Sequence, residues 1–278
     1  MIETRLKLWR SVGAAALAAG ALGIVSCGPN GEAGEASGDA HQAGEAAIGE
    51  TGGEAGEAAA GESGAEHGEA GVADAYAGTD GALRTALRLQ HLKGFVFAAQ
   101  RASEGNTGAD AGVLVSQGLL EVYDPAADQF GSLNADAVRA AGLEALDGQP
   151  RPLVAQRLSA AIAAINQAQA PLNADAAQLT ARMIEISTGL YTHVNGPDGV
   201  DPVEYQHSMG AALAARDALT RGEGVLRARN AARYDEALRE LNRLIELWPT
   251  PSAPETPATL AQVSAQASRV RLALSSFL

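Results

Sequence analysis

An acidic, glycine-rich tract from Gly28 to Gly78 limits how much of the 278-residue chain can form a core. It repeats Gly-Glu-Ala units, contains no Lys or Arg, and carries eleven of the 33 Asp and Glu residues of the chain. Its like charges repel, few of its side chains can be buried, and each glycine disfavours a helix by about 1 kcal/mol. We therefore expect a disordered tether over residues 27–78 and a folded domain of about 200 residues over 79–278.

The domain carries many helix signals and few strand signals. Helix starts are expected at Asp80, Asp124-Pro125, Leu133, Pro152, Leu172, Asp201-Pro202 and Thr256-Pro257. Most of these combine a capping side chain or a first-turn proline with an alanine-rich run that follows. Sustained apolar and polar alternation is missing, and only Asn195-Gly196 suggests a hairpin. The sequence predicts an all-α bundle of six to eight helices.

The first 26 residues have the composition of a secretory signal peptide. Three basic residues among the first ten precede an uncharged apolar run from Ser11 to Ser26. That run is shorter than the roughly 20 residues that span a bilayer core, so a permanent transmembrane helix is the poorer interpretation. We expect residues 1–26 to be removed.

The signal ends in Ile24-Val25-Ser26-Cys27, which resembles the bacterial lipobox. The resemblance implies that Cys27 is lipidated, and a triacylated, palmitate-bearing terminus would supply the several chains that stable anchoring needs. Cys27 is the one cysteine of the chain, so a disulfide framework is excluded. Gly28 follows it, which by resemblance to Gram-negative lipoproteins favours the outer membrane and the periplasm. The alternative is an ordinary signal peptide with an unrelated cysteine.

The sequence lacks the motifs of the common enzyme classes. It contains no nucleophile elbow, phosphate loop, dinucleotide fingerprint or His-Glu-x-x-His zinc motif. A formal net charge of −13 argues against nucleic acid as a partner. We expect a binding protein of the cell envelope with no enzymatic activity.

Glu204 and His207 are the candidate metal ligands. They are three residues apart near the start of a predicted helix, so both lie on one helical face. Carboxylate-bridged di-metal sites use this spacing in two copies with two further carboxylates, and this chain has one copy. A third ligand would come from His91 or His193. The alternative is an acid that complements the helix dipole beside a surface imidazole.

The stretch from Gly199 to Gln206, Gly-Val-Asp-Pro-Val-Glu-Tyr-Gln, is followed by a helix of small residues. It resembles a segment of the extracytoplasmic helical region of bacterial high-affinity iron permeases, and the run from Tyr234 to Pro249 fits the same pattern. His207 stands where that family has an acid, and Ala211 where it has an aromatic residue. The membrane helices and acidic iron-passing motifs of a permease are missing. The resemblance therefore implies an accessory or solute-binding module of iron or other metal uptake.

A second resemblance leads to a different function. Residues 231–249 are similar to the second helix of a tetratricopeptide repeat, although a solenoid needs about three such units and one is present. This resemblance implies a structural or protein-interaction lipoprotein that contacts an envelope protein without metal. Both functions remain open from the sequence.

The lipobox generates a direct test. Cys27→Ser should abolish incorporation of a fatty-acid analogue, because no other residue offers the thiol. Labelling of growing cells, followed by gel fluorescence, measures this, and equal labelling of the variant and the unaltered protein would contradict lipidation at Cys27.

Overall fold

The computed structural model describes residues 70–105, 108–196 and 199–278. Its α-helices are α2 (Ala70–Tyr76), α3 (Gly81–Glu104), α4 (Gly108–Gly118), α5 (Ala135–Arg139), α6 (Leu143–Leu146), α7 (Arg151–Gln169), α8 (Ala176–Tyr191), α9 (Pro202–Arg221), α10 (Glu223–Ile245) and α11 (Leu260–Leu274). The structure also contains a π-helical turn, η1 (Leu119–Tyr123), and two 3-10 helices, η2 (Asp124–Phe130) and η3 (Ala170–Leu172). A short hairpin is formed by β1 (Asn195–Gly196) and β2 (Gly199–Val200).

This architecture confirms the all-α prediction. Seven of the α-helices in the described ranges have eleven residues or more, within the expected six to eight, and three are shorter. The segment with the Asn195-Gly196 hairpin signal forms two antiparallel strands, and Asn195 and Gly196 lie in β1 rather than at the turn. None of the helices in this part of the chain is long and apolar enough to cross a membrane.

Side-chain caps fix the starts of α9 and α11, whereas Asp80 precedes α3 without the capping bond that its sequence predicts. Asp201 caps α9, because its Oδ1 accepts hydrogen bonds from the backbone N–H groups of Val203 (2.8 Å) and Glu204 (3.2 Å). The last helix begins at Leu260 rather than at the expected Thr256-Pro257. A capping box, in which Thr259 and Gln262 bond each other's backbone N–H groups, sets this later start.

Two other expected helix starts do not open long α-helices. Asp124-Pro125 opens the 3-10 helix η2 rather than an α-helix, and Ala126 inside it has non-helical dihedral angles. The start near Leu133 gives only the five-residue helix α5, whose N-cap residue Asn134 makes no side-chain capping bond. Neither segment therefore becomes one of the long helices of the bundle.

Helix α2 lies inside the segment that we expected to be tether. It packs against α8, Ala75 is fully buried, and the Tyr76 hydroxyl lies 3.1 Å from Nδ1 of His91. Val72, Ala75 and Tyr76 have the spacing of one helical face, which supplies enough apolar surface for docking. Residues 70–78, which we expected to be tether, therefore include a helix that packs on the domain. The expected signal peptide and the rest of the tether, residues 1–69, lie outside the described residues.

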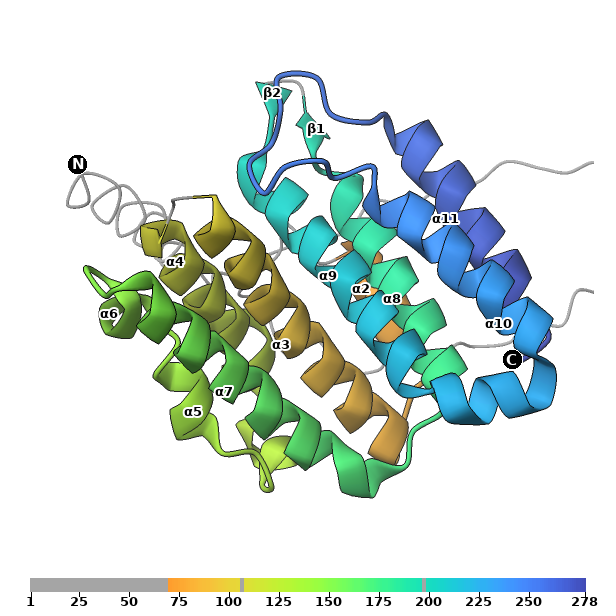
Figure 1. Cartoon of the computed structure of the whole chain (residues 1–278), viewed down its shortest axis with the longest axis horizontal. Coiled ribbons are helices and arrows are strands. Elements are labelled where there is room, and N and C mark those ends of the chain that lie inside the picture. Colours follow the sequence, from red (N-terminus) through yellow and green to blue (C-terminus); the bar gives the residue numbers. More distant parts are fainter. Residues whose placement is uncertain (1–69, 106–107, 197–198) are drawn as a thin grey trace, which may run out of the picture. The chain divides into compact units, whose positions relative to one another are not determined.

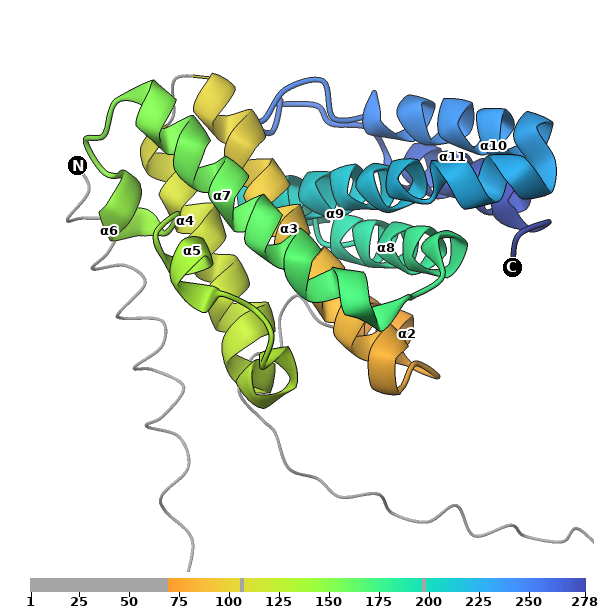
Figure 2. The same ribbon diagram turned by 60° about the horizontal axis from the view of Figure 1, so that its bottom comes forward.

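Helices α3 and α9 are the central elements. Helix α3 packs against α4 and α7 on one side and against α9 on the other, while α9 also packs against α8 and α10 (Figures 1 and 2). Helix α11 pairs with α10 and also contacts α8. The α3–α9 contact thus links the two groups of helices.

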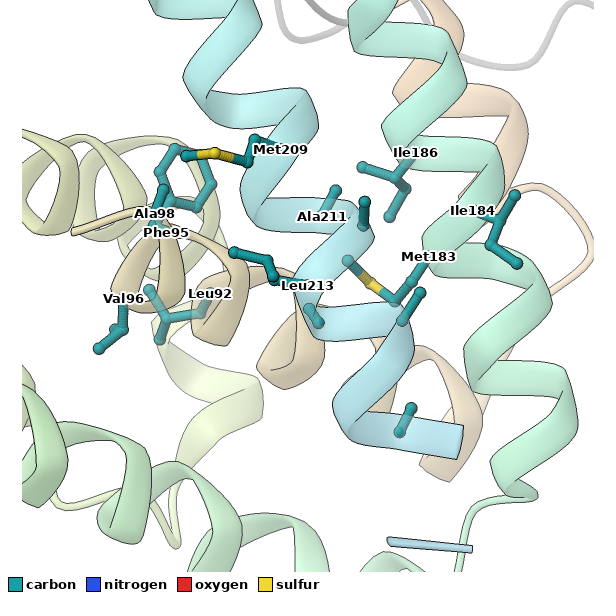
Figure 3. Packing of buried hydrophobic residues seen from close by; sticks show 14 of the residues in the cluster. Leu92, Phe95, Val96, Ala98, Met183, Ile184, Ile186, Met209, Ala211 and Leu213 are labelled. Atoms are coloured by element: carbon teal, nitrogen blue, oxygen red, sulfur yellow. The ribbon is translucent and has the colours of Figure 1, made fainter. Parts of the chain in front are cut away.

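Two glycines bring α3 and α9 together. A Cβ atom added at Gly210 would lie 2.4 Å from the carbonyl oxygen of Gly94, and one added at Gly94 would lie 3.1 Å from that of Gly210. The side chains of Phe95, Met209 and Leu213 lie around this crossing (Figure 3). Because any larger residue would occupy the space of the facing backbone, the crossing requires glycine at 210.

A buried polar cluster joins α3, α7 and α9 beside the crossing. The ammonium group of Lys93, which is 0 % exposed, donates to Asp217 Oδ2 (2.9 Å), Gln169 Oε1 (2.9 Å) and Gln90 Oε1 (3.2 Å). Arg221 donates to both glutamine oxygens and pairs with Asp217. Burial lowers the pKa of Lys93 to about 8, and Asp217 opposes that shift. Removing one partner of a buried pair typically costs about 3–5 kcal/mol, because the remaining charge stays buried without compensation.

The glycine crossing predicts the effect of a single methyl group. Gly210→Ala should lower the free energy of unfolding by about 1–3 kcal/mol, because the new Cβ overlaps the backbone of α3. Urea denaturation followed by circular dichroism measures this difference. Gly224→Ala is the matched control: it lies in α10 with nothing within 4 Å of its added Cβ, so stability should stay level or rise by up to about 1 kcal/mol. Equal effects of the two substitutions would contradict a tight crossing.

Candidate functional site

The first turns of α9 hold the predicted site, and most of their side chains serve the fold. The hydroxyl of Tyr205 donates to the carbonyl oxygen of Thr250 (3.1 Å), and Nε2 of Gln206 donates to that of Pro251 (3.1 Å). Both acceptors belong to the proline-rich loop between α10 and α11. Tyr205 and Gln206 therefore fasten this loop to α9.

The same loop is fastened from the next turn of α9 and from α8. Nε1 of Trp248 donates to Oγ of Ser208 (3.1 Å), and the edge of the Tyr191 ring meets Trp248 with centroids 5.4 Å apart. The Tyr191 hydroxyl donates to the carbonyl oxygen of Ala258 (2.7 Å), near the start of α11. The loop thus has a fixed position over the N-terminal end of α9.

His207 is a buried, neutral side chain. Its Nε2 lies 3.1 Å from Oε1 of Gln117 on α4, and its ring meets Phe95 edge-on with centroids 4.7 Å apart. Because an amide oxygen can only accept, Nε2 carries the proton and the lone pair is on Nδ1. Burial lowers the pKa of His207 to about 4. The surface imidazole that the sequence left open as an alternative is therefore not what the structure shows.

The other two histidines in the described ranges are His91 and His193. His91 is buried on α3, with Nδ1 bonded to Tyr76 and its ring centroid 5.4 Å from that of Phe95. Phe95 therefore contacts both buried imidazoles, and burial lowers the pKa of His91 to about 3. His193 is exposed in the turn after α8.

Glu204 is the group in this turn that the fold leaves unsatisfied. Its side chain is half-buried, and its Oε2 atom is buried with no hydrogen-bond donor among the described residues. Burial raises the pKa of Glu204 to about 7, and the nearby Asp201 carboxylate adds to the shift. A proton or a cation on this carboxylate would remove the unfavourable buried charge.

The metal-ligand prediction can be compared with this geometry. Over the described residues, no three or more His, Cys, Asp or Glu side chains are grouped so as to hold a metal ion. Glu204 and His207 lie three residues apart in α9, as predicted. Neither His91 nor His193 joins them in a group that could hold a metal ion.

Sequence analysis missed two features of this region. Gln117, the partner of His207, is 90 residues away along the chain, and no local pattern indicates it. Lys93 could have been noticed, because it is a lone charge inside the apolar stripe of Leu89, Leu92 and Val96.

Comparisons with known proteins do not extend this picture. No protein-family model, no curated protein and no solved structure matches the chain.

Proposed function

We propose that the chain is a lipid-anchored binding protein of the cell envelope, whose helical domain takes a metal cation at Glu204 as an accessory of iron or other metal acquisition. The signal segment and Cys27 support the location, and the resemblance around Gly199–Gln206 supports the link to metal uptake. The observation that carries the proposal is the buried Oε2 atom of Glu204, which has no donor among the described residues.

An unsatisfied buried carboxylate oxygen is unfavourable unless something compensates it. Leaving a polar group without its hydrogen bond costs about 1–3 kcal/mol in protein mutational data, so such atoms are rare in native interiors. Tyr205, Gln206 and His207 in the same turn all have partners, and Glu204 does not. A cation would supply the missing partner, and the lone pair on Nδ1 of His207 lies one turn further along the helix.

The ligand chemistry suits transition metals. One carboxylate and one neutral imidazole are ligands that iron, zinc and copper accept. Two protein ligands make a weak site, so we expect modest affinity and rapid exchange. Protons compete for the carboxylate, since the pKa of Glu204 is raised to about 7.

A second function is favoured by a different observation. Helices α10 and α11 pack as a pair, and the segment similar to a tetratricopeptide helix lies in α10 with Tyr234, Ala237 and Leu241 buried. Helix pairs of this kind build protein-binding scaffolds. The chain would then contact an envelope protein without metal.

Calorimetric titration of the mature chain with iron, zinc and copper tests the metal proposal. We expect saturable binding of at least one ion, weakened by roughly tenfold or more in Glu204→Gln, which keeps the shape but removes the charge. His207→Ala should weaken binding too, with circular dichroism to check that the variant folds.

The matched controls are Glu144→Gln, an exposed acid on α6, and His193→Ala, an exposed histidine. Both should bind as the unaltered protein does. Absence of saturable binding, or unchanged binding by Glu204→Gln, would refute the metal site, and the protein-interaction function would then lead.

A further inference from the structure

The end of the α10–α11 pair exposes aliphatic side chains. Leu272 is 73 % exposed, Val225 69 % and Leu278 60 %, which makes them three of the four most exposed large apolar residues in the described ranges. The fourth, Leu120, is 62 % exposed and belongs to the π-helical turn η1. Exposed aliphatic residues gathered at one end of a pair of helices indicate a contact surface.

These residues lie at the same end of the pair because α10 and α11 run in opposite directions (Figure 1). Arg229 is one turn after Val225 in the chain, and its Nη2 donates to the carbonyl oxygen of Phe277 (3.1 Å). The guanidinium group of Arg229 also lies 5.3 Å from the centroid of the Phe277 ring. Phe277 directly precedes Leu278 in the chain. The start of α10 and the C-terminal residues are therefore in contact.

Backbone geometry also shapes this end of α10. Asn230 has non-helical dihedral angles (φ −162°, ψ 97°), so the first two turns of α10 are kinked relative to the rest. Its Oδ1 accepts a hydrogen bond from the backbone N–H of Arg233, which restarts the helix after the kink. Val225 is thus presented on a separate short segment.

This end carries two arginines without a carboxylate partner, although the chain is acidic. Residues 260–278 contain Arg269 and Arg271 and no Asp or Glu, while the whole chain has a formal net charge of −13. In the part of the chain that the structure describes, Arg229 and Arg269 have no carboxylate partner, and Arg271 pairs with Glu185 across to α8. Arg227 at the same end is balanced by Glu223 and Asp235.

We propose that this hairpin end, formed by Val225, Leu272, Leu278, Arg229 and Arg269, contacts the surface of an anionic lipid bilayer. Exposed aliphatic side chains beside Arg229 and Arg269, which have no carboxylate partner among the described residues, match the headgroup region, where the apolar groups enter and the guanidinium groups meet phosphate. The arginines favour an anionic membrane over an apolar protein surface, because an apolar surface without acidic groups would leave their charges unpaired. The contact is independent of the metal site, and an anchor at Cys27 would keep the surface within reach of a membrane.

Vesicle co-sedimentation tests the contact without the anchor. The mature chain carrying Cys27→Ser is mixed with vesicles of phosphatidylglycerol and phosphatidylcholine in equal parts, or of phosphatidylcholine alone. We expect binding to the anionic vesicles, weaker binding to the neutral ones, and a loss of binding as salt is raised. Leu272→Glu should reduce the partition coefficient by roughly tenfold or more, because it removes one buried aliphatic side chain and adds a repelled charge.

Leu120→Glu is the matched control, since Leu120 is similarly exposed but lies on another element. It should bind as the parent chain does. Failure to bind anionic vesicles, or equal losses in the two variants, would overturn the proposal. A stable dimer in light scattering that Leu272→Glu dissociates would also overturn it, because a second copy would then cover this surface. None of these outcomes bears on metal binding at Glu204.

Discussion

The backbone contact between Gly94 and Gly210 is the constraint on which the rest of this structure depends. With no Cβ on either residue, α3 and α9 approach until the backbone of one meets that of the other. On one side of this contact the short distance lets Nε2 of Gln90 reach the carbonyl oxygen of Ala214 (2.6 Å) and lets Lys93 enter the polar cluster. On the other side it places Phe95 against His207.

This rigid crossing explains why most of the conspicuous side chains on α9 are structural. Tyr205, Gln206 and Ser208 hold the loop before α11, and His207 bonds α4. Most side chains of the turn that suggested metal chemistry therefore have structural hydrogen-bond partners. The Glu204 carboxylate differs from these groups, because its buried Oε2 atom has no donor among the described residues, and we propose that a cation binds there.

The buried groups give opposite dependences of stability on pH. The pKa of Glu204 is raised from 4.5 to about 7, so its contribution is complete below pH 4.5 and is lost as the pH rises through 7. The pKa of His207 is lowered from 6.5 to about 4, so its contribution is complete above pH 6.5 and is lost as the pH falls through 4. A cation bound by the Glu204 carboxylate would therefore stabilise the fold most at neutral pH and above.

Local signals in the sequence indicated α3, α7, α8 and α9, but they gave no start for α4 or α10 and did not show which helices pack together. The Asp201-Pro202 start of α9 followed from a capping acid and a first-turn proline, and the structure confirms it. The start of α11 was wrong, because a capping box at Thr259 outweighed the proline at 257. Helix α2 was missed, since the surrounding Gly-Glu-Ala repeats hid its small apolar face. Glu204 could be placed on a helix from sequence, but its lack of a donor depends on which side chains the fold brings near it.

The ionisation of Glu204 is the most direct test of this account. Side-chain carboxyl carbons of 13C-labelled glutamate can be followed by NMR as a function of pH, with the Glu204→Gln variant identifying the resonance. The account predicts a midpoint near 7 that moves to lower pH when zinc is added, because the cation competes with the proton. A midpoint near 4.5 that zinc leaves unchanged would contradict it, since Glu204 would then be an ordinary solvated carboxylate with no ligand to bind.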